Sequence, residues 1–285
     1  MFLKSLIWKF CKRPTKFILA YSGIYFLIRT IEMKLAFIDS VLFTQIKSES
    51  LIKFHGYLEQ VTGTKGNLVR VGSRHDGGYV ILDSFSEVGV CISLGIGANM
   101  DFESELLSRN IPILAVDGTI QKLPCTPHKS IRWLDKNVGG KDIGSEISLN
   151  SVFERSFEYF RWGGDCILKI DIEGSEYEVL KAFDAGHQIR ASQIVLELHN
   201  LVFKLYHSPT EVFELMEQLL KTHDLVHIHG NNYEYSITVQ GLTLPNVLEL
   251  TFVRKEFSKS LEKRIILPNP LDAPNNRFLR EIDLL

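Results

Sequence analysis

The stretch VGVCISLGIGAN, residues Val88 to Asn99, joins an apolar run to a glycine-rich turn, and a helix-like segment follows at 101–109. A short apolar run that ends at such a turn is typical of a buried strand. Glycines directly after a strand let the chain turn sharply and let a ligand approach the backbone closely. The stretch therefore predicts a strand-turn-helix unit with a ligand site at the carboxyl end of the strand.

Strand-like and helix-like segments alternate after this unit. The predicted strands are 113–116, 131–134, 166–170, 194–198, 225–228 and 247–253, and the predicted helices are 101–109, 149–160, 176–183 and 211–221. This alternation is typical of a parallel sheet with helices on both faces. The last two strands lack a convincing helix between them, whereas a parallel crossover usually contains one. We therefore expect an α/β, Rossmann-like sheet that is mainly parallel and closes with an antiparallel strand.

The amino-terminal segment differs from the rest in charge. Residues 1–34 contain seven Lys or Arg and one acid, a net charge of +6, so the other residues carry −8 of the total of −2. The apolar run 17–28 is shorter than the roughly 20 residues that span a bilayer. We expect residues 1–34 to rest on the protein body or to contact an anionic membrane peripherally.

Three regions are predicted on this basis. They are a basic helical extension over 1–60, an α/β domain over 61–256 and a proline-fixed carboxyl-terminal tail over 257–285. The 45% hydrophobic and 23% charged residues are typical of a globular protein. Four cysteines without metal-finger spacing favour a reducing, cytoplasmic setting. The acidic body, which has no basic-aromatic stripe, argues against nucleic-acid binding.

A nucleoside site is predicted around the glycine turn. Asp117 ends the second predicted strand, 20 residues after Gly97, where an acid typically accepts hydrogen bonds from ribose hydroxyls. Two short strands are predicted before this site, at 68–71 and 79–82. The loop that joins them either forms a lid over the site or is a plain hairpin turn. The residues expected to contact the nucleoside are Asp76, Gly78, Gly95, Gly97, Ala98, Asn99 and Asp117.

A second polar group follows the next two predicted strands. The string Asp171-Ile172-Glu173-Gly174-Ser175-Glu176 holds three carboxylates, which are costly unless they are solvated, paired or metal-bound. Glu197 and His199 end the following strand and point to the same side if the strand continues. We expect Asp171 to converge with them at one edge of the sheet. Such a trio suits a divalent cation, or a general base with its orienting acid, and Glu173 is a further catalytic candidate.

A polar string at His229-Gly230-Asn231-Asn232 lies near the end of the predicted domain. The side chains of His229, Asn231 and Asn232 suit the hydroxyls of a sugar, and the same residues also form a good turn. We therefore expect these three residues to bind a small-molecule or glycan substrate.

Together these strings resemble the FkbM-type and related methyltransferase-like enzymes, which are class I S-adenosylmethionine-dependent methyltransferases. The resemblance runs from about Leu68 to Val253. It is carried by the strings DGGY at 76–79, SLGIG at 93–97, DFE at 101–103, DIEGSE at 171–176 and ELH at 197–199, and by the polar turn at 229–232. The string DIEGSE is the most specific of them.

The resemblance implies S-adenosylmethionine as the cofactor and O-methylation of a sugar, glycan or similar hydroxylated metabolite. By position, it implies that Gly95, Gly97 and Asp117 contact the cofactor. It likewise implies that the groups near the reacting hydroxyl are Asp171, Glu173 and His199. One departure concerns the acid that many class I enzymes carry just before the first glycine, because this chain has Ser93 and Leu94 there. Asp101 or Glu103 could substitute for it.

Two other functions fit the same turn. An NAD(P)-dependent oxidoreductase also begins with a strand, a glycine turn and a helix, but the third glycine of the dinucleotide fingerprint is missing because Asn99 follows Ala98. The predicted antiparallel closing pair also argues against it. The basic amino terminus suggests instead a non-catalytic, membrane-associated module that keeps the same fold.

Overall fold

The computed structural model describes residues 48–260 and 267–284. Residues 1–47, which include most of the predicted basic extension, lie outside the described residues. The membrane contact expected for residues 1–34 therefore falls outside them as well. None of the helices in the described part of the chain is both long and apolar enough to cross a membrane.

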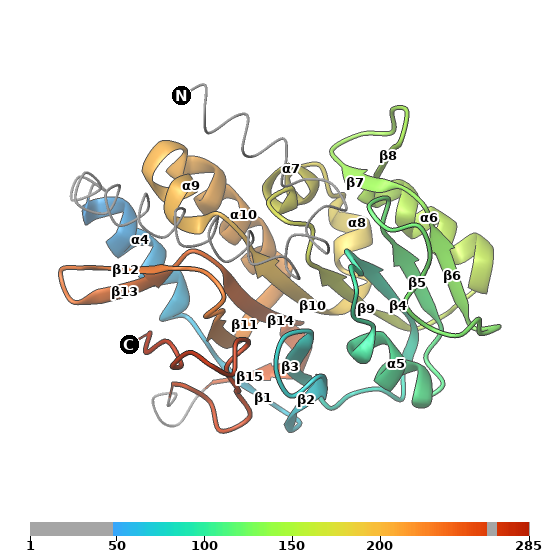
Figure 1. Ribbon diagram of the computed structural model, residues 1–285, viewed down its shortest axis with the longest axis horizontal. Coiled ribbons are helices and arrows are strands. Elements are labelled where there is room, and N and C mark those ends of the chain that lie inside the picture. The colour runs from blue at the N-terminus through green and yellow to red at the C-terminus, as the bar shows by residue number, and fades with distance from the viewer. Residues whose placement is uncertain (1–47, 261–266, 285) are drawn as a thin grey trace.

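Seven strands form the central sheet, in the order β11-β14-β10-β9-β4-β5-β6 (Figure 1). Their bounds are β4 Val88–Leu94, β5 Ile113–Val116, β6 Ile131–Leu134, β9 Asp165–Ile170, β10 Ala191–Leu198, β11 His223–Gly230 and β14 Leu248–Arg254. Strands β6, β5, β4, β9 and β10 pair in parallel, and β14 pairs antiparallel with both β10 and β11. The mainly parallel sheet and its antiparallel closing pair are confirmed, and the arrangement is consistent with a Rossmann-like fold. The last long strand, β14, lies inside the sheet, between β10 and β11.

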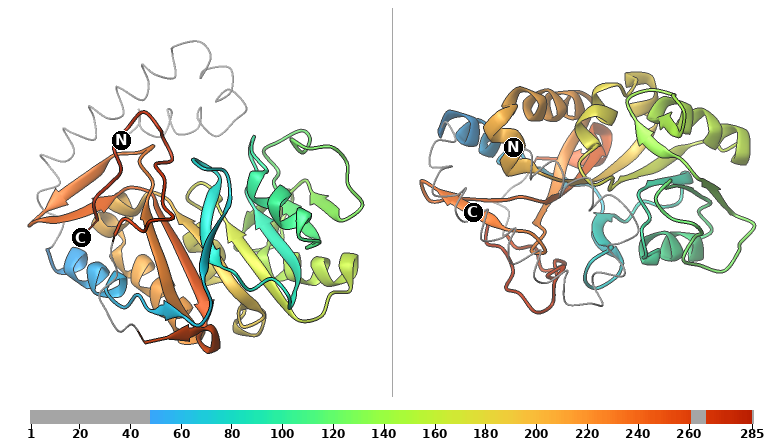
Figure 2. Two further views of the ribbon diagram at one scale, coloured as in Figure 1. Left: turned by 90° about the horizontal axis from the view of Figure 1, so that it is seen from below. Right: turned by 45° about the horizontal axis from the view of Figure 1, so that its top comes forward.

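Helices cover both faces of this sheet (Figures 1 and 2). The helices are α4 Ser48–Leu58, α5 Asp101–Ser108, α6 Leu149–Phe160, α7 Glu176–Lys181, α8 Ala185–Gln188, α9 Leu201–His207 and α10 Pro209–Thr222, with the 3-10 turn η1 at Lys255–Phe257. Successive residues of a strand point to opposite faces. Accordingly, Cys91 of β4 packs in the cluster that contains α5, whereas Ile92 packs in the larger cluster that contains α4, α6, α7, α9 and α10.

Four short antiparallel or parallel pairs surround the central sheet. They are β1 Gly63–Thr64 with β15 Ser258–Lys259, β2 Leu68–Gly72 with β3 Gly78–Leu82, β7 Asn137–Gly139 with β8 Glu146–Ser148, and β12 Ser236–Val239 with β13 Leu242–Pro245. The β2–β3 pair confirms the two strands expected before the sheet. The β12–β13 hairpin was not predicted. Its two-residue turn uses positive φ at both Gln240 and Gly241, and glutamine is a weak signal for that turn type.

Helix α10 illustrates how the sequence attaches the helical layer. It starts at Pro209, whose missing N–H is harmless at the first helical position. The apolar residues that recur every three or four positions are all buried: Val212, Leu215, Met216 and Leu219. Burying each such side chain contributes about 2 kcal/mol. This face holds α10 against α7 and β11, so it helps to fix the strand ends that carry the polar residues.

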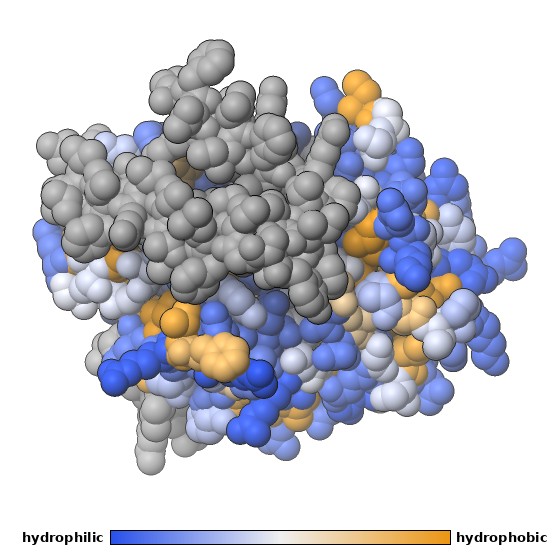
Figure 3. All heavy atoms as spheres, viewed as in Figure 1, coloured by the Kyte–Doolittle hydropathy of each residue, from blue (hydrophilic) through white to orange (hydrophobic). Residues whose placement is uncertain are grey.

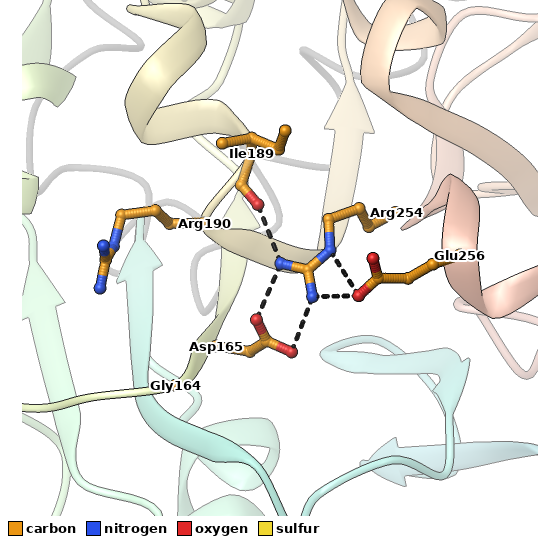
Figure 4. Close-up of a pocket in the computed structure, with 6 residues that line it drawn as sticks. All are labelled: Gly164, Asp165, Ile189, Arg190, Arg254 and Glu256. Carbon is orange, nitrogen blue, oxygen red and sulfur yellow. Dashed lines mark hydrogen bonds and ion pairs between the residues drawn. The ribbon is translucent and has the colours of Figure 1, made fainter.

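A salt-bridge clamp joins strands at the edge of the sheet opposite the predicted site (Figure 4). Arg254, at the end of antiparallel β14, donates two hydrogen bonds to Asp165 at the start of β9, at 2.8 and 3.1 Å. It also donates to the carbonyl of Ile189 and pairs with Glu256. These protein partners occupy the guanidinium group of Arg254, so it is not free to bind an anion in the surface pocket that these residues line.

We expect Arg254→Ala to lower the free energy of unfolding by about 2 kcal/mol, because Asp165 would lose its partner in a largely buried position. Urea denaturation measures this change. The control is Arg155→Ala, which removes an exposed pair with Glu158 and should cost about 0.5 kcal/mol or less. Equal losses in the two variants would contradict the clamp.

Candidate functional site

The two glycines of the turn after β4 have different roles. Gly95 has φ +78°, and a Cβ there would lie 1.6 Å from the carbonyl oxygen of Asp171, so no other residue fits. Gly97 has φ +58°, and a Cβ there would meet nothing within 4 Å. Gly97, Ala98 and Asn99 are exposed. Gly95 thus packs the turn against the next strand end, whereas Gly97, Ala98 and Asn99 form an open surface. Contact of these residues with a nucleoside stays a prediction.

Asp117 anchors this turn from the end of β5. Its Oδ2 accepts hydrogen bonds from the N–H groups of Ile96 and Gly97, both at 2.9 Å, and its Oδ1 accepts two from Thr119. Burial acts to raise the pKa of Asp117, but these hydrogen bonds hold it below its usual value. A carboxylate offers about four acceptor sites, so the protein itself fills them. Contact of Asp117 with a ribose stays a prediction.

The loop between β2 and β3 contacts the glycine turn through Asn99. The Nδ2 of Asn99 donates to the backbone carbonyl of Asp76, and its Oδ1 accepts from the N–H of Asp101 at the start of α5. Asp76 is exposed. Its pKa is nevertheless raised, because neighbouring protein atoms partly desolvate the carboxyl group and because Asp171 and Glu249 carry like charge. Gly78 is buried beneath this loop. The loop before β3 therefore joins the antiparallel strands β2 and β3 as a hairpin and lies beside the glycine turn. Its role as a lid stays a prediction.

Asp171, Glu197 and His199 converge at the carboxyl ends of β9 and β10. The Nε2 of His199 lies 3.7 Å from Glu197 Oε1 and 3.9 Å from Asp171 Oδ1. One ligand atom from each of the three residues lies within 4.8 Å of the others. The convergence expected from the sequence is confirmed.

Glu176 holds the third member of this trio in place. Its Oε1 lies 2.9 Å from His199 Nδ1 and accepts from the N–H groups of Ile172 and Gly174. The side chain of Glu176 is fully buried, and its Oε2 has no hydrogen-bond partner among the described residues. One carboxylate therefore orients both the imidazole and the loop that follows β9.

The exposed side chain of Glu173 lies on that loop. Its φ is +57°, in the left-handed region that residues with a side chain rarely adopt. Strain of this kind persists only where the surrounding structure enforces it, and it gathers at functional sites. Here the two backbone hydrogen bonds to Glu176 hold the loop. The catalytic role expected for Glu173 stays a prediction.

Two polar residues that the sequence analysis did not assign complete the cluster. Tyr79 of β3 donates its hydroxyl to Glu197 Oε2 at 2.8 Å and lies 3.3 Å from Asp171 Oδ2. Lys169 of β9 donates to the carbonyl of Gly95 at 2.8 Å and lies 3.3 Å from the same Asp171 oxygen. Lys169 had a local signal, a charged residue inside an apolar strand. Tyr79 belongs to the string DGGY, but that string assigned it no role, because only the packing of β3 over the sheet brings it here.

The carboxylates control the charge of the imidazole. Burial alone would lower the pKa of His199, but Glu176, Glu197 and Asp171 raise it well above its ordinary value. Burial and the charge of Asp171 raise the pKa of Glu197, and His199 opposes them. The three carboxylates therefore stabilise a positive charge on His199, against the effect of burial.

The residues expected to bind substrate divide into two groups. Asn231 reaches the trio, because its Nδ2 donates to Glu197 Oε1 at 2.8 Å. His229 is buried between Glu249 and Glu281, with 2.8 Å at each ring nitrogen. The amide group of Asn232 donates to the backbone carbonyls of Asn276, Leu279 and Arg280 in the tail. Its oxygen accepts a hydrogen bond from the N–H of Asn276. His229 and Asn232 thus hold the carboxyl-terminal tail, and their contact with substrate stays a prediction.

The tail contributes a side chain to the site. Asn275, which is 2% exposed, donates to Glu249 Oε1 at 2.5 Å, and Glu249 faces the trio from β14. Further along, Phe278 and Leu279 of the tail are exposed. Asn275 had no signal in the sequence, because its contact depends on how the tail folds back.

The described residues on the face shown in Figure 3 are mostly hydrophilic, with apolar side chains in small groups.

The predicted substitute for the missing acid lies beneath the turn. Glu103 of α5 is 2% exposed and accepts a hydrogen bond of 2.5 Å from Ser93 at the end of β4. Asp101, the other candidate, is exposed at the start of the same helix. The buried pair of Ser93 and Glu103 places a carboxylate behind the turn.

A model of a known protein family matches part of this chain. Residues 126–254 match the family model of the methyltransferase FkbM domain. This match confirms the resemblance over the strings at 171–176, 197–199 and 229–232, whereas the resemblance of residues 68–125 stays a prediction. No curated protein matches the chain.

Proposed function

We propose that this chain, which carries a methyltransferase FkbM domain over residues 126–254, uses S-adenosylmethionine to methylate a hydroxyl of a sugar, glycan or similar hydroxylated metabolite. The observation that supports this proposal most directly is the position of the trio. Asp171, Glu197 and His199 lie at the strand ends next to the open surface at Gly97. In open α/β sheets, ligands bind outside the carboxyl ends of strands.

The sheet order adds support. Antiparallel β14 lies between β10 and β11 in an otherwise parallel sheet. A mainly parallel sheet that closes with an antiparallel pair is the arrangement of class I methyltransferases. The turn after β4 also suits a cofactor without phosphates, because it lacks the third glycine that a pyrophosphate cradle uses.

S-adenosylmethionine would supply a methyl group on a sulfonium, which the acceptor oxygen attacks in line. The carbon–oxygen bond forms as the carbon–sulfur bond breaks, and the hydroxyl proton leaves to a base. The residues at the site hold the acceptor in position, which contributes most of such catalysis. Asp171 is the proposed proton acceptor, because its side chain is 27% exposed whereas that of His199 is 11% exposed. The same trio also suits a divalent cation, which would acidify the hydroxyl.

Calorimetric titration tests the cofactor. We expect S-adenosylhomocysteine to bind with a Kd in the micromolar range and NAD to show no binding. Mass spectrometry of the denatured protein should identify the same nucleoside if it copurifies. Binding of NAD and not of S-adenosylhomocysteine would favour the oxidoreductase instead.

Replacing Gly97 by alanine is expected to weaken S-adenosylhomocysteine binding by about tenfold or more, because the new Cβ would occupy the open surface of the turn. Gly144→Ala is a matched control. Gly144 has φ +59°, and a Cβ there also meets nothing within 4 Å. Both variants should lose about 1 kcal/mol of stability from the positive φ. Equal cofactor affinity in the two variants would remove Gly97 from the site.

A further inference from the structure

We propose that Asp171, Glu197 and His199 bind one divalent cation of the Mg²⁺ or Mn²⁺ type, which holds the acceptor hydroxyl. This inference rests on the proposed function for the role of the cation, but the binding itself depends only on the three side chains. Their ligand atoms all lie within 4.8 Å of one another.

The distances between these atoms suit a shared cation. The Nε2 of His199 lies 3.7 and 3.9 Å from the nearest carboxylate oxygens of Glu197 and Asp171, too far for hydrogen bonds. Around a cation with metal–ligand distances of about 2.1 to 2.4 Å, neighbouring ligand atoms lie about 3.0 to 3.4 Å apart and opposite ones about 4.2 to 4.8 Å apart. The observed separations fall between these values, so small side-chain movements suffice.

The atoms that face this point are those that the protein leaves available. Asp171 uses Oδ2 for Tyr79 and Lys169, which leaves Oδ1 toward His199. Glu197 uses Oε2 for Tyr79, and its Oε1 accepts one hydrogen bond, from Asn231. A carboxylate oxygen has two lone pairs, so Oε1 retains one for a cation.

The imidazole is oriented as in metal sites. A histidine that binds a metal through one ring nitrogen commonly donates the other N–H to a carboxylate, which sets the tautomer and the ring position. His199 Nδ1 lies 2.9 Å from the buried Oε1 of Glu176. This contact leaves Nε2 as the ligand atom, on the side of Asp171 and Glu197.

The local charge also favours a cation. Glu249 lies opposite Glu197 in the β10–β14 register, and Tyr79 bridges Glu197 and Asp171, so three carboxylates lie close together beside one paired cation, Lys169. Buried carboxylates at such distances are costly without a counter-charge. Two carboxylates and one imidazole are ligands that Mn²⁺ and Mg²⁺ accept, with the remaining coordination positions left for water or a substrate hydroxyl.

Titration of the full-length, metal-free protein with Mn²⁺, followed by electron paramagnetic resonance, tests the site. We expect one bound Mn²⁺ per chain. Asp171→Asn and Glu197→Gln should each weaken binding by about 30-fold or more, and Glu176→Gln by about tenfold through the orientation of His199. Asp142→Asn is the matched control, because this carboxylate accepts hydrogen bonds from Ser148, the N-cap of α6, and from Ser151. The affinity of this variant for Mn²⁺ should equal that of the wild type.

A spectroscopic signature separates ligation from a general loss of folding. Nitrogen coupling in the spin-echo signal of the bound Mn²⁺ should be present in the wild type and absent in His199→Gln. No Mn²⁺ binding by the wild type, or equal binding by Asp171→Asn and Glu197→Gln, would overturn the inference. S-adenosylhomocysteine titrated into the same metal-free sample tests the proposed function separately, since its binding does not require the cation.

Discussion

Replacing Asp171 or His199 by alanine is expected to lower the rate of methyl transfer by about a hundredfold or more. The affinity for S-adenosylhomocysteine should stay within about threefold of the wild type, because neither side chain lies on the open surface of the glycine turn. The rate should fall because both side chains meet at the strand ends, where an acceptor hydroxyl would lie. There Asp171 would accept the proton, or both residues would act as cation ligands. The measurement is transfer of labelled methyl from S-adenosylmethionine to an acceptor found by screening hydroxylated metabolites and glycans.

The backbone should tolerate the change at position 171. Gly95 packs on the carbonyl of Asp171, not on its side chain, so Asp171→Ala keeps that contact. Asp142→Ala is the control, since it removes a helix-capping carboxylate and should cost about 1 kcal/mol of stability without affecting turnover. Full activity of both Asp171→Ala and His199→Ala would refute the assignment of the site.

The second large effect is expected from His229, which fastens the tail. Burial alone would lower the pKa of His229, but its contacts with Glu249 and Glu281 raise it to about 10. Because the folded pKa lies above the unfolded one, the stabilisation is complete below pH 6.5 and is lost as the pH rises through 10. A shift of this size from the ordinary value of 6.5 corresponds to on the order of 5 kcal/mol.

Urea denaturation between pH 6 and pH 10 measures this loss. The wild type should lose stability over this range, and His229→Gln should be less stable at pH 6 and lose much less as the pH rises. Hydrogen exchange over residues 275–284 should increase in parallel, since His229 and Asn232 hold this part of the tail. A pH dependence that is the same in both proteins would exclude the clamp.

His223 provides a control of opposite sign. Burial lowers its pKa to about 4, and its Nε2 bonds the carbonyl of Ala191. Its contribution is therefore complete above pH 6.5 and is lost as the pH falls toward 4. Any loss of stability between pH 7 and pH 10 should remain in His223→Gln, because this residue is already neutral over that range.

Much of the architecture could be predicted from local patterns. The strands 88–94, 113–116 and 131–134 and the helix 149–160 have the bounds expected from the sequence. Apolar runs of these lengths have few other stable conformations once they are buried. The convergence of Asp171, Glu197 and His199 followed from the same reasoning, since parallel strands bring their carboxyl ends to one edge. The elements that were missed, such as β12–β13 and α9, lack a strong periodic pattern or turn signal.

The chain's residues alone therefore specify the α/β sheet and the strand ends that carry the polar side chains, because these depend on periodicity and spacing along the chain. The methyltransferase resemblance rests instead on short strings such as DIEGSE at 171–176. The tertiary structure decides the partners. Tyr79 and Asn275 reach the carboxylates from segments far away in the sequence, and Asp117 holds the turn through backbone hydrogen bonds. The tertiary structure also distinguishes the roles of two glycines: Gly95 packs on Asp171, whereas Gly97 faces open space. These outcomes depend on which segments pack side by side, and no local pattern encodes that.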